Sequence, residues 1–357
     1  EFGMSPTEAA WLTMAVQVGF VIGTLSSALI NLADVLHARV LLFLGCLAGA
    51  IANASLLLAP GSGSVIGLRV LTGVALACVY PPGMKLAAGW FRERRGLALG
   101  ILIGALTLGK AFPHLLRAIY GEDWRGPMLF TSALAAVGGT VALVTVRDGP
   151  YVTATAPFDP RAIWRILQSR GARRATFGYL GHMWELYAMW TWIAVLATAS
   201  FTAAGVASAS ASGSLAAFVA IGSGTAGCVV AGWFADRLGR ARVAMWAMWT
   251  SAACAALTIV AFGRHPGWFF LLAAIWGFAV VADSAQFSAL VSEHAPPDHI
   301  GTALTLQTCL GFLLTLVTIE LLPRLAGVVG WQYAALLLVP GPLLGIVAIR
   351  RMPRMRE

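Results

Sequence analysis

The chain has little charge for its length. Only 11% of its 357 residues are Asp, Glu, Lys or Arg, whereas hydrophobic residues make up 59%. A soluble domain carries about 25% charged residues, so this composition excludes an ordinary water-soluble globular protein. A lipid bilayer is the solvent that suits it, and a chain that crosses a bilayer must form helices or a closed barrel.

Cysteine is also scarce, and its positions exclude two kinds of site. All five cysteines lie within apolar runs and none forms a C-x-x-C pair, so neither a zinc site nor a disulfide framework is indicated. They are Cys46, Cys78, Cys228, Cys254 and Cys309. The sequence also contains no phosphate-binding Gly-rich loop with lysine, no metal-ligand cluster and no catalytic triad. We therefore expect no enzyme activity, no metal and no cofactor.

Long apolar runs are what the sequence has in abundance. They are about 20 residues long and show no alternating ten-residue pattern, which favours transmembrane helices over barrel strands. The sequence thus predicts an all-α membrane protein with eleven spans. They lie at about 9–30, 40–60, 64–90, 97–120, 124–146, 175–199, 212–233, 243–263, 267–290, 301–323 and 328–349.

A polar loop between two of these runs is the most specific motif. It reads Gly232-Trp-Phe-Ala-Asp236-Arg237-Leu-Gly239-Arg240-Ala-Arg242. It resembles the G-x-x-x-D-R-x-G-R-[RK] loop of the major facilitator superfamily (MFS), a large group of secondary transporters. A weaker copy reads Asn31-Leu-Ala-Asp34-Val-Leu-His37-Ala-Arg39, in which only Asp34 and Arg39 survive.

The two copies belong to a repeat that runs along the chain. Asp34 matches Asp236, Arg95 matches Ile300, and Asp123 matches Gly330, at offsets of 202, 205 and 207 residues. The resemblance implies the MFS fold, which has two pseudo-symmetric bundles of six helices each. We expect an N-terminal bundle over 1–146, a basic linker over 147–174 and a C-terminal bundle over 175–357.

The first half contains one span fewer than the second. One span precedes the Asp34 loop and two precede the Asp236 loop, so the chain has five plus six spans of an expected twelve. We interpret this as the absence of the family's first helix, with residues 1–6 forming the outer loop after it. A natural eleven-helix protein is the alternative.

Basic residues gather in alternate loops, as the positive-inside rule requires. This distribution explains the net charge of +9 without nucleic acid, and it places the linker and the C-terminus in the cytoplasm. The linker also holds several arginines and a predicted surface helix. We expect a monomeric multi-pass protein of the plasma membrane, in this case the bacterial inner membrane.

The resemblance implies a conformational role for the Asp236 loop. Within the family, such a loop is a cytoplasmic latch that stabilises one state of the transport cycle. Asp236 is expected to accept from a helix N-terminus or to pair with an arginine, and Gly239 to allow a tight turn. The alternative is a simple turn that holds Arg237 and Arg240 inside. For the first-half copy, Asp34 and Arg39 are the candidates.

Two of the cations that lie within predicted spans are candidate site residues. Arg69 begins Arg69-Val-Leu-Thr-Gly73-Val-Ala, which resembles the family's R-x-x-x-G-x-G motif with Ala75 in place of the second glycine. Lys110 lies deep in the 97–120 span. A charge at such a depth costs at least about 2.5–3.5 kcal/mol on insertion scales and therefore needs a partner or a purpose. Both are candidates for binding an anionic substrate. The alternatives are snorkelling for Arg69 and a structural ion pair for Lys110.

The 175–199 span carries a histidine and an acid on one helical face, His182 and Glu185. An acid at mid-membrane beside a histidine is a candidate proton carrier, because burial disfavours its charged form. The alternative is an ion pair with Lys110 or Arg69. Asp283 and Gln286 share a face of the 267–290 span and are further candidates for substrate binding or proton coupling.

Together these features predict a secondary active transporter that moves a small organic or inorganic anion by proton-coupled alternating access. Its partners are a small-molecule substrate, protons and the lipid bilayer. Two alternatives remain: a truncated fragment that does not transport, and a membrane sensor built on a transporter-like fold.

Overall fold

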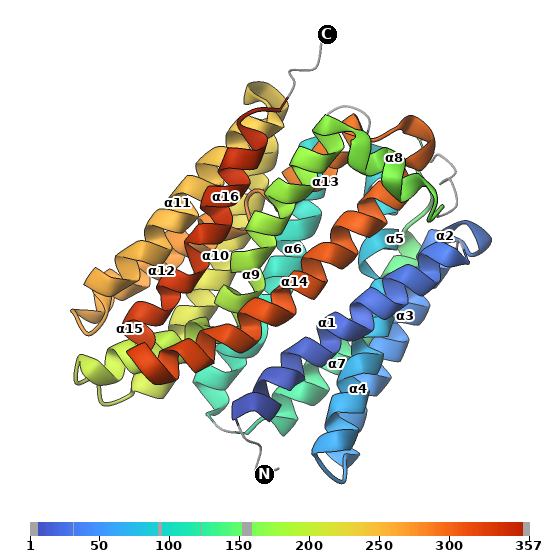
Figure 1. Ribbon diagram of the computed structural model, residues 1–357. Helices are drawn as coiled ribbons and strands as arrows, with labels where there is room; N and C mark the ends of the chain where they lie inside the picture. Colours follow the sequence, from blue (N-terminus) through green and yellow to red (C-terminus); the bar gives the residue numbers. More distant parts are fainter. Residues whose placement is uncertain (1–5, 31, 92–94, 122, 152–158, 353–357) are drawn as a thin grey trace. The chain divides into compact units, whose positions relative to one another are not determined.

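The computed structural model describes residues 6–30, 32–91, 95–121, 123–151 and 159–352 (Figure 1). These residues form α-helices and short 3-10 helices, with no strand among them. Eleven helical stretches of this described part are long and apolar enough to cross a membrane. The predicted all-α membrane architecture is thereby confirmed.

The first five spanning stretches are built from six α-helices and one 3-10 helix. They are α1 (Pro6–Leu29), α3 (Ala38–Ala54) with η1 (Ser55–Leu58), α4 (Ser62–Ala77) with α5 (Tyr80–Trp90), α6 (Arg95–Tyr120) and α7 (Arg125–Thr145). The four-residue helix α2 (Leu32–Val35) lies between the first two stretches, and α8 (Ala162–Gln168) follows the last.

The other six stretches include a 34-residue helix, α9, that extends beyond both predicted ends of its span. They are α9 (Arg170–Ala203), α10 (Ala209–Leu238), α11 (Arg240–Ala261), α12 (Pro266–Val280) with α13 (Ser284–His294), α14 (Ile300–Val329) after η2 (Pro297–His299), and α15 (Trp331–Ala334) with η3 (Ala335–Leu338) and α16 (Pro340–Ile349).

One predicted loop is wrong. We predicted a loop between the spans that end at 323 and begin at 328, but α14 continues through Pro323 to Val329. Arg324 pairs with Glu320 one turn earlier, and Gly330 with φ of +82° ends the helix instead. A left-handed glycine is a stronger stop here than a proline, which removes one backbone hydrogen bond and leaves the others in place.

The repeat appears in the helix breaks as well as in the sequence. In the first half, Cys78 and Val79 separate α4 from α5, and in the second half Val281, Ala282 and Asp283 separate α12 from α13. The break in the second half follows the break in the first by nearly the same number of residues as separate the two copies of the loop motif. The two halves therefore share a helix break at the equivalent place, as a pseudo-symmetric fold predicts.

The helices group into two compact units. Unit 1 comprises Glu1–Arg95, Asp123–Arg165 and Pro297–Leu316, and unit 2 comprises Gly96–Glu122, Ile166–Pro296 and Val317–Glu357. α6 thus groups with helices of the second half, and the first part of α14 with helices of the first. The division into bundles over 1–146 and 175–357 stays a prediction.

Unit 2 is held together by close backbone contacts. A Cβ atom on Gly277 of α12 would fall on the carbonyl group of Ala220 in α10, and Gly100 of α6 meets the Cys228 carbonyl in the same way. Small residues at helix interfaces let membrane helices approach this closely. Gly104 also fits this expectation, but Gly109 has open space around it, so close packing does not explain that glycine.

Candidate functional site

Glu185 is enclosed among neutral donors. It lies in the middle of α9 and is 2% exposed. Its Oε1 accepts a hydrogen bond from Ser251 Oγ of α11 at 2.6 Å and another from Trp276 Nε1 of α12 at 2.6 Å. Three helices of unit 2 therefore converge on one carboxyl group. Both of these partners are uncharged, so the arrangement differs from the ion pair with Lys110 or Arg69 that the sequence left open.

His182 lies one turn before Glu185 but faces different groups. Its Nδ1 is 2.8 Å from Asp283 Oδ1, and its Nε2 is 2.9 Å from Ser284 Oγ. That oxygen of Asp283 accepts no conventional hydrogen bond from the described residues, so the His182 contact is its polar partner. His182 and Asp283 are 3% and 2% exposed.

The local backbone explains how Asp283 reaches the histidine. Asp283 is the last residue of the break between α12 and α13, and its main chain accepts from Gln286 and Phe287 at the start of α13. The centroids of the Tyr179 and Phe287 rings lie 5.9 and 5.8 Å from that of the His182 ring and 6.3 Å from each other, so the three rings form a triangle. His182 and Asp283 are therefore in direct contact beside two aromatic rings.

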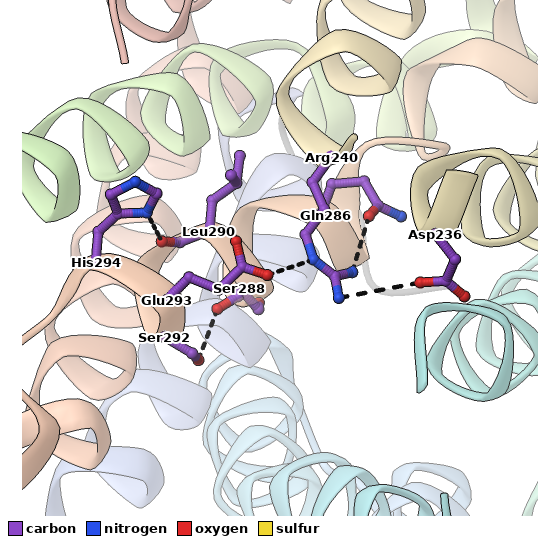
Figure 2. A network of polar contacts seen from close by, with 8 residues as sticks. All are labelled: Asp236, Arg240, Gln286, Ser288, Leu290, Ser292, Glu293 and His294. Atoms are coloured by element: carbon purple, nitrogen blue, oxygen red, sulfur yellow. Dashed lines mark hydrogen bonds and ion pairs between the residues drawn. The ribbon is translucent and has the colours of Figure 1, made fainter. Parts of the chain in front are cut away.

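Gln286, the fourth candidate of this half, takes part in a different cluster. Figure 2 shows its Oε1 directed at Arg240, with Arg240 Nη1 3.5 Å away. Arg240 Nε also donates to Glu293 Oε1 at 2.6 Å, and Nη2 lies 4.0 Å from Asp236 Oδ1. The arginine at the start of α11 thus connects the end of α10 to α13.

Asp236 also borders the beginning of another helix. A Cβ atom on Gly96, in the first turn of α6, would collide with the Asp236 carboxylate. Negative charge is favourable at a helix N-terminus, and Arg240 lies within ion-pair distance on the other side of the loop. Which of these serves as the partner of Asp236 stays a prediction. Gly239 has φ of +90° between α10 and α11, which is the tight turn expected of it.

Arg237 is held away from this cluster. Its guanidinium lies 3.6 Å from the centroid of the Trp233 ring, one turn earlier in α10. In the first-half copy of the loop, the Asp34 side chain lies outside the described residues. Arg39 is the second residue of α3. A latch at Asp34 and Arg39 stays a prediction.

Arg69 lies in unit 1, in the middle of α4, and is half-buried. Its Nη1 donates to Asn53 Oδ1 of α3 at 3.5 Å. The Asn53 amide nitrogen in turn donates to Ser132 Oγ, Thr131 Oγ1 and the Met128 carbonyl of α7, at 3.0, 3.4 and 3.3 Å. These acceptors fix the amide so that its oxygen faces the arginine.

Lys110, the other candidate cation, lies in α6 of unit 2 and is exposed. It therefore does not belong to the Asn53 cluster. The candidate residues fall into four places: Arg69 with Asn53, Lys110, the buried acids of α9 and the break, and the Arg240 cluster. Among the described residues no group of three His, Cys, Asp or Glu side chains could hold a metal ion.

Three functional neighbours escaped the sequence analysis. Asn53 is a lone amide in an apolar span, which is a signal that could have been used. Glu293 is an acid close to the end of a spanning stretch, and only the fold places it against Arg240. Trp276 looks like one more apolar residue, and its donor role depends on the approach of α12 to α9.

Two family profiles match the chain. The one described as Major Facilitator Superfamily matches residues 1–227, and the one described as Sugar (and other) transporter matches residues 175–353. The two matches overlap between 175 and 227 and together extend over most of the chain.

Similarity to individual proteins is confined to short segments. The riboflavin transporter RibJ of Trypanosoma cruzi (strain CL Brener) is 30% identical over 83 residues, which are 23% of this chain and 18% of that protein. The MFS-type transporter pytF of Aspergillus terreus (strain NIH 2624 / FGSC A1156) is 34% identical over 64 residues, 17% of this chain and 22% of that protein. The match thus spans about a fifth of each relative's length.

Proposed function

Because the chain belongs to the major facilitator superfamily, we propose that this solute transporter is a secondary active transporter that moves a small anion together with protons. It does so by alternating access, in which two halves of the protein rock around a central substrate site. The observation that carries the proposal is the enclosure of Glu185 among neutral donors in the membrane-spanning part of α9.

Glu185 is the proton carrier in this proposal. A charged side chain in the bilayer is costly, and Ser251 and Trp276 supply hydrogen bonds without supplying a compensating charge. In this proposal Glu185 carries its proton while it is enclosed in this way. It loses that proton when a rearrangement brings in water or a cation. His182 and Asp283 form a second proton-sharing pair beside it.

Arg69 and Lys110 are the proposed anion-binding groups. Arg69 uses one donor on Asn53, which is neutral and so leaves the guanidinium charge uncompensated by that contact. An arginine presents five N–H donors in a fork that fits carboxylate or phosphate. The remaining donors suit a substrate carboxylate, and substrate binding would offset the cost of the buried charge.

The Arg240 cluster is the proposed cytoplasmic latch. Arg240 joins α10, α11 and α13 through Asp236, Gln286 and Glu293. α13 also begins directly after Asp283, so a change at His182 and a change at Arg240 both act on this helix. The latch is then a state-dependent contact that opens during each cycle.

The proposed location is the bacterial inner membrane, with the linker and the C-terminus in the cytoplasm and the protein acting as a monomer. Labelling of single cysteines tests the orientation. Ser62→Cys is expected to react with an impermeant reagent from outside, and Arg94→Cys and Arg242→Cys only after the membrane is opened. Reaction of Arg94→Cys from outside would reverse the orientation.

The transport proposal is tested in proteoliposomes that contain the pH-sensitive dye pyranine. External acetate, lactate, succinate, benzoate, phosphate and riboflavin are added one at a time, the last because it names one relative. We expect acidification of the interior with at least one anion, above that of protein-free vesicles. Radiolabelled solute uptake without acidification would refute the proton coupling. No flux of any probe, in a well-folded protein, would favour the fragment or sensor.

A further inference from the structure

An exposed seam of unit 2 joins arginines to apolar side chains. The seam is the line along which α9 and α16 run side by side (Figure 1). The helices touch through glycines: a Cβ atom on Gly341 would lie 2.7 Å from the Gly181 carbonyl oxygen, and one on Gly178 would lie 2.5 Å from Ile349 Cγ2. So close a contact places the side chains that flank it on one continuous surface.

The α9 side of the seam carries one stripe of exposed residues. Arg170, Arg173, Arg174 and Phe177 are spaced as i, i+3, i+4 and i+7, which places them on one face of the helix. Arg170 and Arg173 are exposed and Arg174 is half-buried. Phe177 is 56% exposed. The stripe thus changes from cationic at the helix start to aromatic one turn further into the span.

The α16 side likewise has apolar side chains within the span and arginines at the end of the helix. Leu344 and Val347 are 68% and 46% exposed, and Arg350 and Arg351 follow at the end of the helix, both exposed. The Arg174 guanidinium donates to the backbone carbonyl of Arg351. The cationic ends of the two stripes therefore meet, and the apolar parts of both extend from there into the membrane-spanning region.

Two arginines of this seam donate hydrogen bonds to neutral groups. Arg173 donates to the Leu167 carbonyl and Arg174 to the Arg351 carbonyl. Within the described part of the chain none of the five arginines forms an ion pair with a carboxylate. Three of them also stand in the first turns of α9, where the helix dipole is positive as well. The arginine side chains and the helix dipole thus place positive charge in the same region, where a bound anion would be stabilised.

We propose that this seam binds an anionic phospholipid. The phosphate lies against Arg173, Arg174 and Arg351, and an acyl chain follows Phe177 and Leu344 towards the bilayer centre. The lipid belongs to the cytoplasmic leaflet, a statement that rests on the orientation in the proposed function. A free phosphate ion would use the arginines but would leave the apolar stripes without a role.

The experiment measures lipid retention by native mass spectrometry of the full chain, purified in detergent. Phosphatidylglycerol and phosphatidylcholine with the same acyl chains are added in separate titrations. We expect one tightly retained phosphatidylglycerol and no comparable retention of phosphatidylcholine. Arg173→Gln and Arg174→Gln should each weaken retention about fivefold, the effect of about 1 kcal/mol per basic residue.

Arg242→Gln is the matched control, because Arg242 is also exposed and also lies in the first turn of a spanning helix. It should leave retention unchanged. Equal losses in Arg242→Gln and Arg173→Gln would overturn the site in favour of diffuse attraction. Equal retention of both lipids would overturn the headgroup recognition. Full displacement of phosphatidylglycerol by an equal concentration of inorganic phosphate would assign the arginines to a free anion.

Two further points keep the result interpretable. If Arg174→Gln lowers the melting temperature, Arg173→Gln decides, because its contact is with the neighbouring Leu167 carbonyl alone. The measurement involves no transport. Lipid retention in a protein that moves no solute would therefore refute the proposed function and leave this inference intact. Solute transport by a protein that does not retain the lipid would refute only this inference.

Discussion

Arg69 in unit 1 and Glu185 in unit 2 are both ionisable groups in membrane-spanning helices, and the two units treat them differently. Glu185 is 2% exposed and accepts two hydrogen bonds of 2.6 Å from two neighbouring helices. Arg69 is half-buried and makes one long contact of 3.5 Å to an amide oxygen. The acid is enclosed, whereas the cation has one long contact to a neutral group among the described residues.

This difference suggests a division of labour. A group that must bind and release a substrate needs hydrogen-bonding capacity, and the contact of Arg69 with Asn53 uses one of the five N–H donors of an arginine. A group that must take up a proton in one state only needs to be sealed in the other, and the close packing around Glu185 provides such a seal. The following experiments test the two parts of this comparison, beginning with the largest expected effect.

Loss of the cation should have the largest effect. Arg69→Gln is expected to weaken anion binding and transport by roughly 100-fold, because charge-assisted hydrogen bonds to the substrate are lost. Lys110→Gln is measured in parallel, and a larger loss there would make Lys110 the main anion-binding group. Initial rates of uptake in proteoliposomes provide the measurement. Normal uptake by both variants would show that neither cation binds the substrate.

A new carboxylate beside Arg69 should compete with the substrate. Asn53→Asp is expected to raise KM about tenfold by neutralising the guanidinium. Asn53→Ala is the control, since it removes the same hydrogen bonds without adding a charge, and its KM should rise less. If the two variants have the same KM, Asn53 has only a structural role. Competition between the new carboxylate and the substrate for Arg69 would then not account for the rise in KM.

The latch should affect rate rather than binding. Asp236→Asn and Glu293→Gln are each expected to slow solute exchange about fivefold while leaving substrate affinity unchanged, because each removes one charged partner of Arg240. The double variant should be slower by less than the product of the two effects, as is typical of side chains that share a partner. Unchanged exchange in both single variants, at normal expression, would leave the loop as a turn only.

The smallest effect distinguishes two tryptophans of unit 2. Trp276→Phe removes a hydrogen bond to a carboxyl group and Trp192→Phe removes one to the Ile319 carbonyl. We expect losses in unfolding free energy of about 2 and about 1 kcal/mol respectively, measured by unfolding in denaturing detergent. The excess for Trp276 should disappear in a Glu185→Gln background. If it persists, packing rather than the carboxyl contact accounts for it.

Much of the fold was predictable because apolar run length and the repeat determine it. The all-α spans, the Asp236 loop and its tight turn at Gly239 follow from local pattern. The partners of Arg240 and Glu185 were not predictable, because they lie on helices tens of residues away and depend on how closely glycine-containing helices approach. Gln286 illustrates this limit: its spacing from Asp283 suggested a shared face, but its side chain turns to Arg240.

The latch copy at Asp34 and Arg39 and the absent first helix stay predictions. The first depends on a side chain outside the described residues, and the second on the chain before residue 1. The boundary at 323 was wrong because α14 continues through Pro323, whose ring is tolerated in a helix that keeps its other hydrogen bonds.

The central claim is that Glu185 carries the proton that drives transport, and Glu185→Gln tests it most directly. Glutamine imitates the protonated acid and can still accept from Ser251 and Trp276. In proteoliposomes with an imposed pH gradient, the variant should fail to accumulate solute yet exchange internal for external solute at a normal rate, since exchange needs no net proton movement. Accumulation against a gradient at the normal rate, with normal pH dependence, would contradict the claim and direct attention to Asp283.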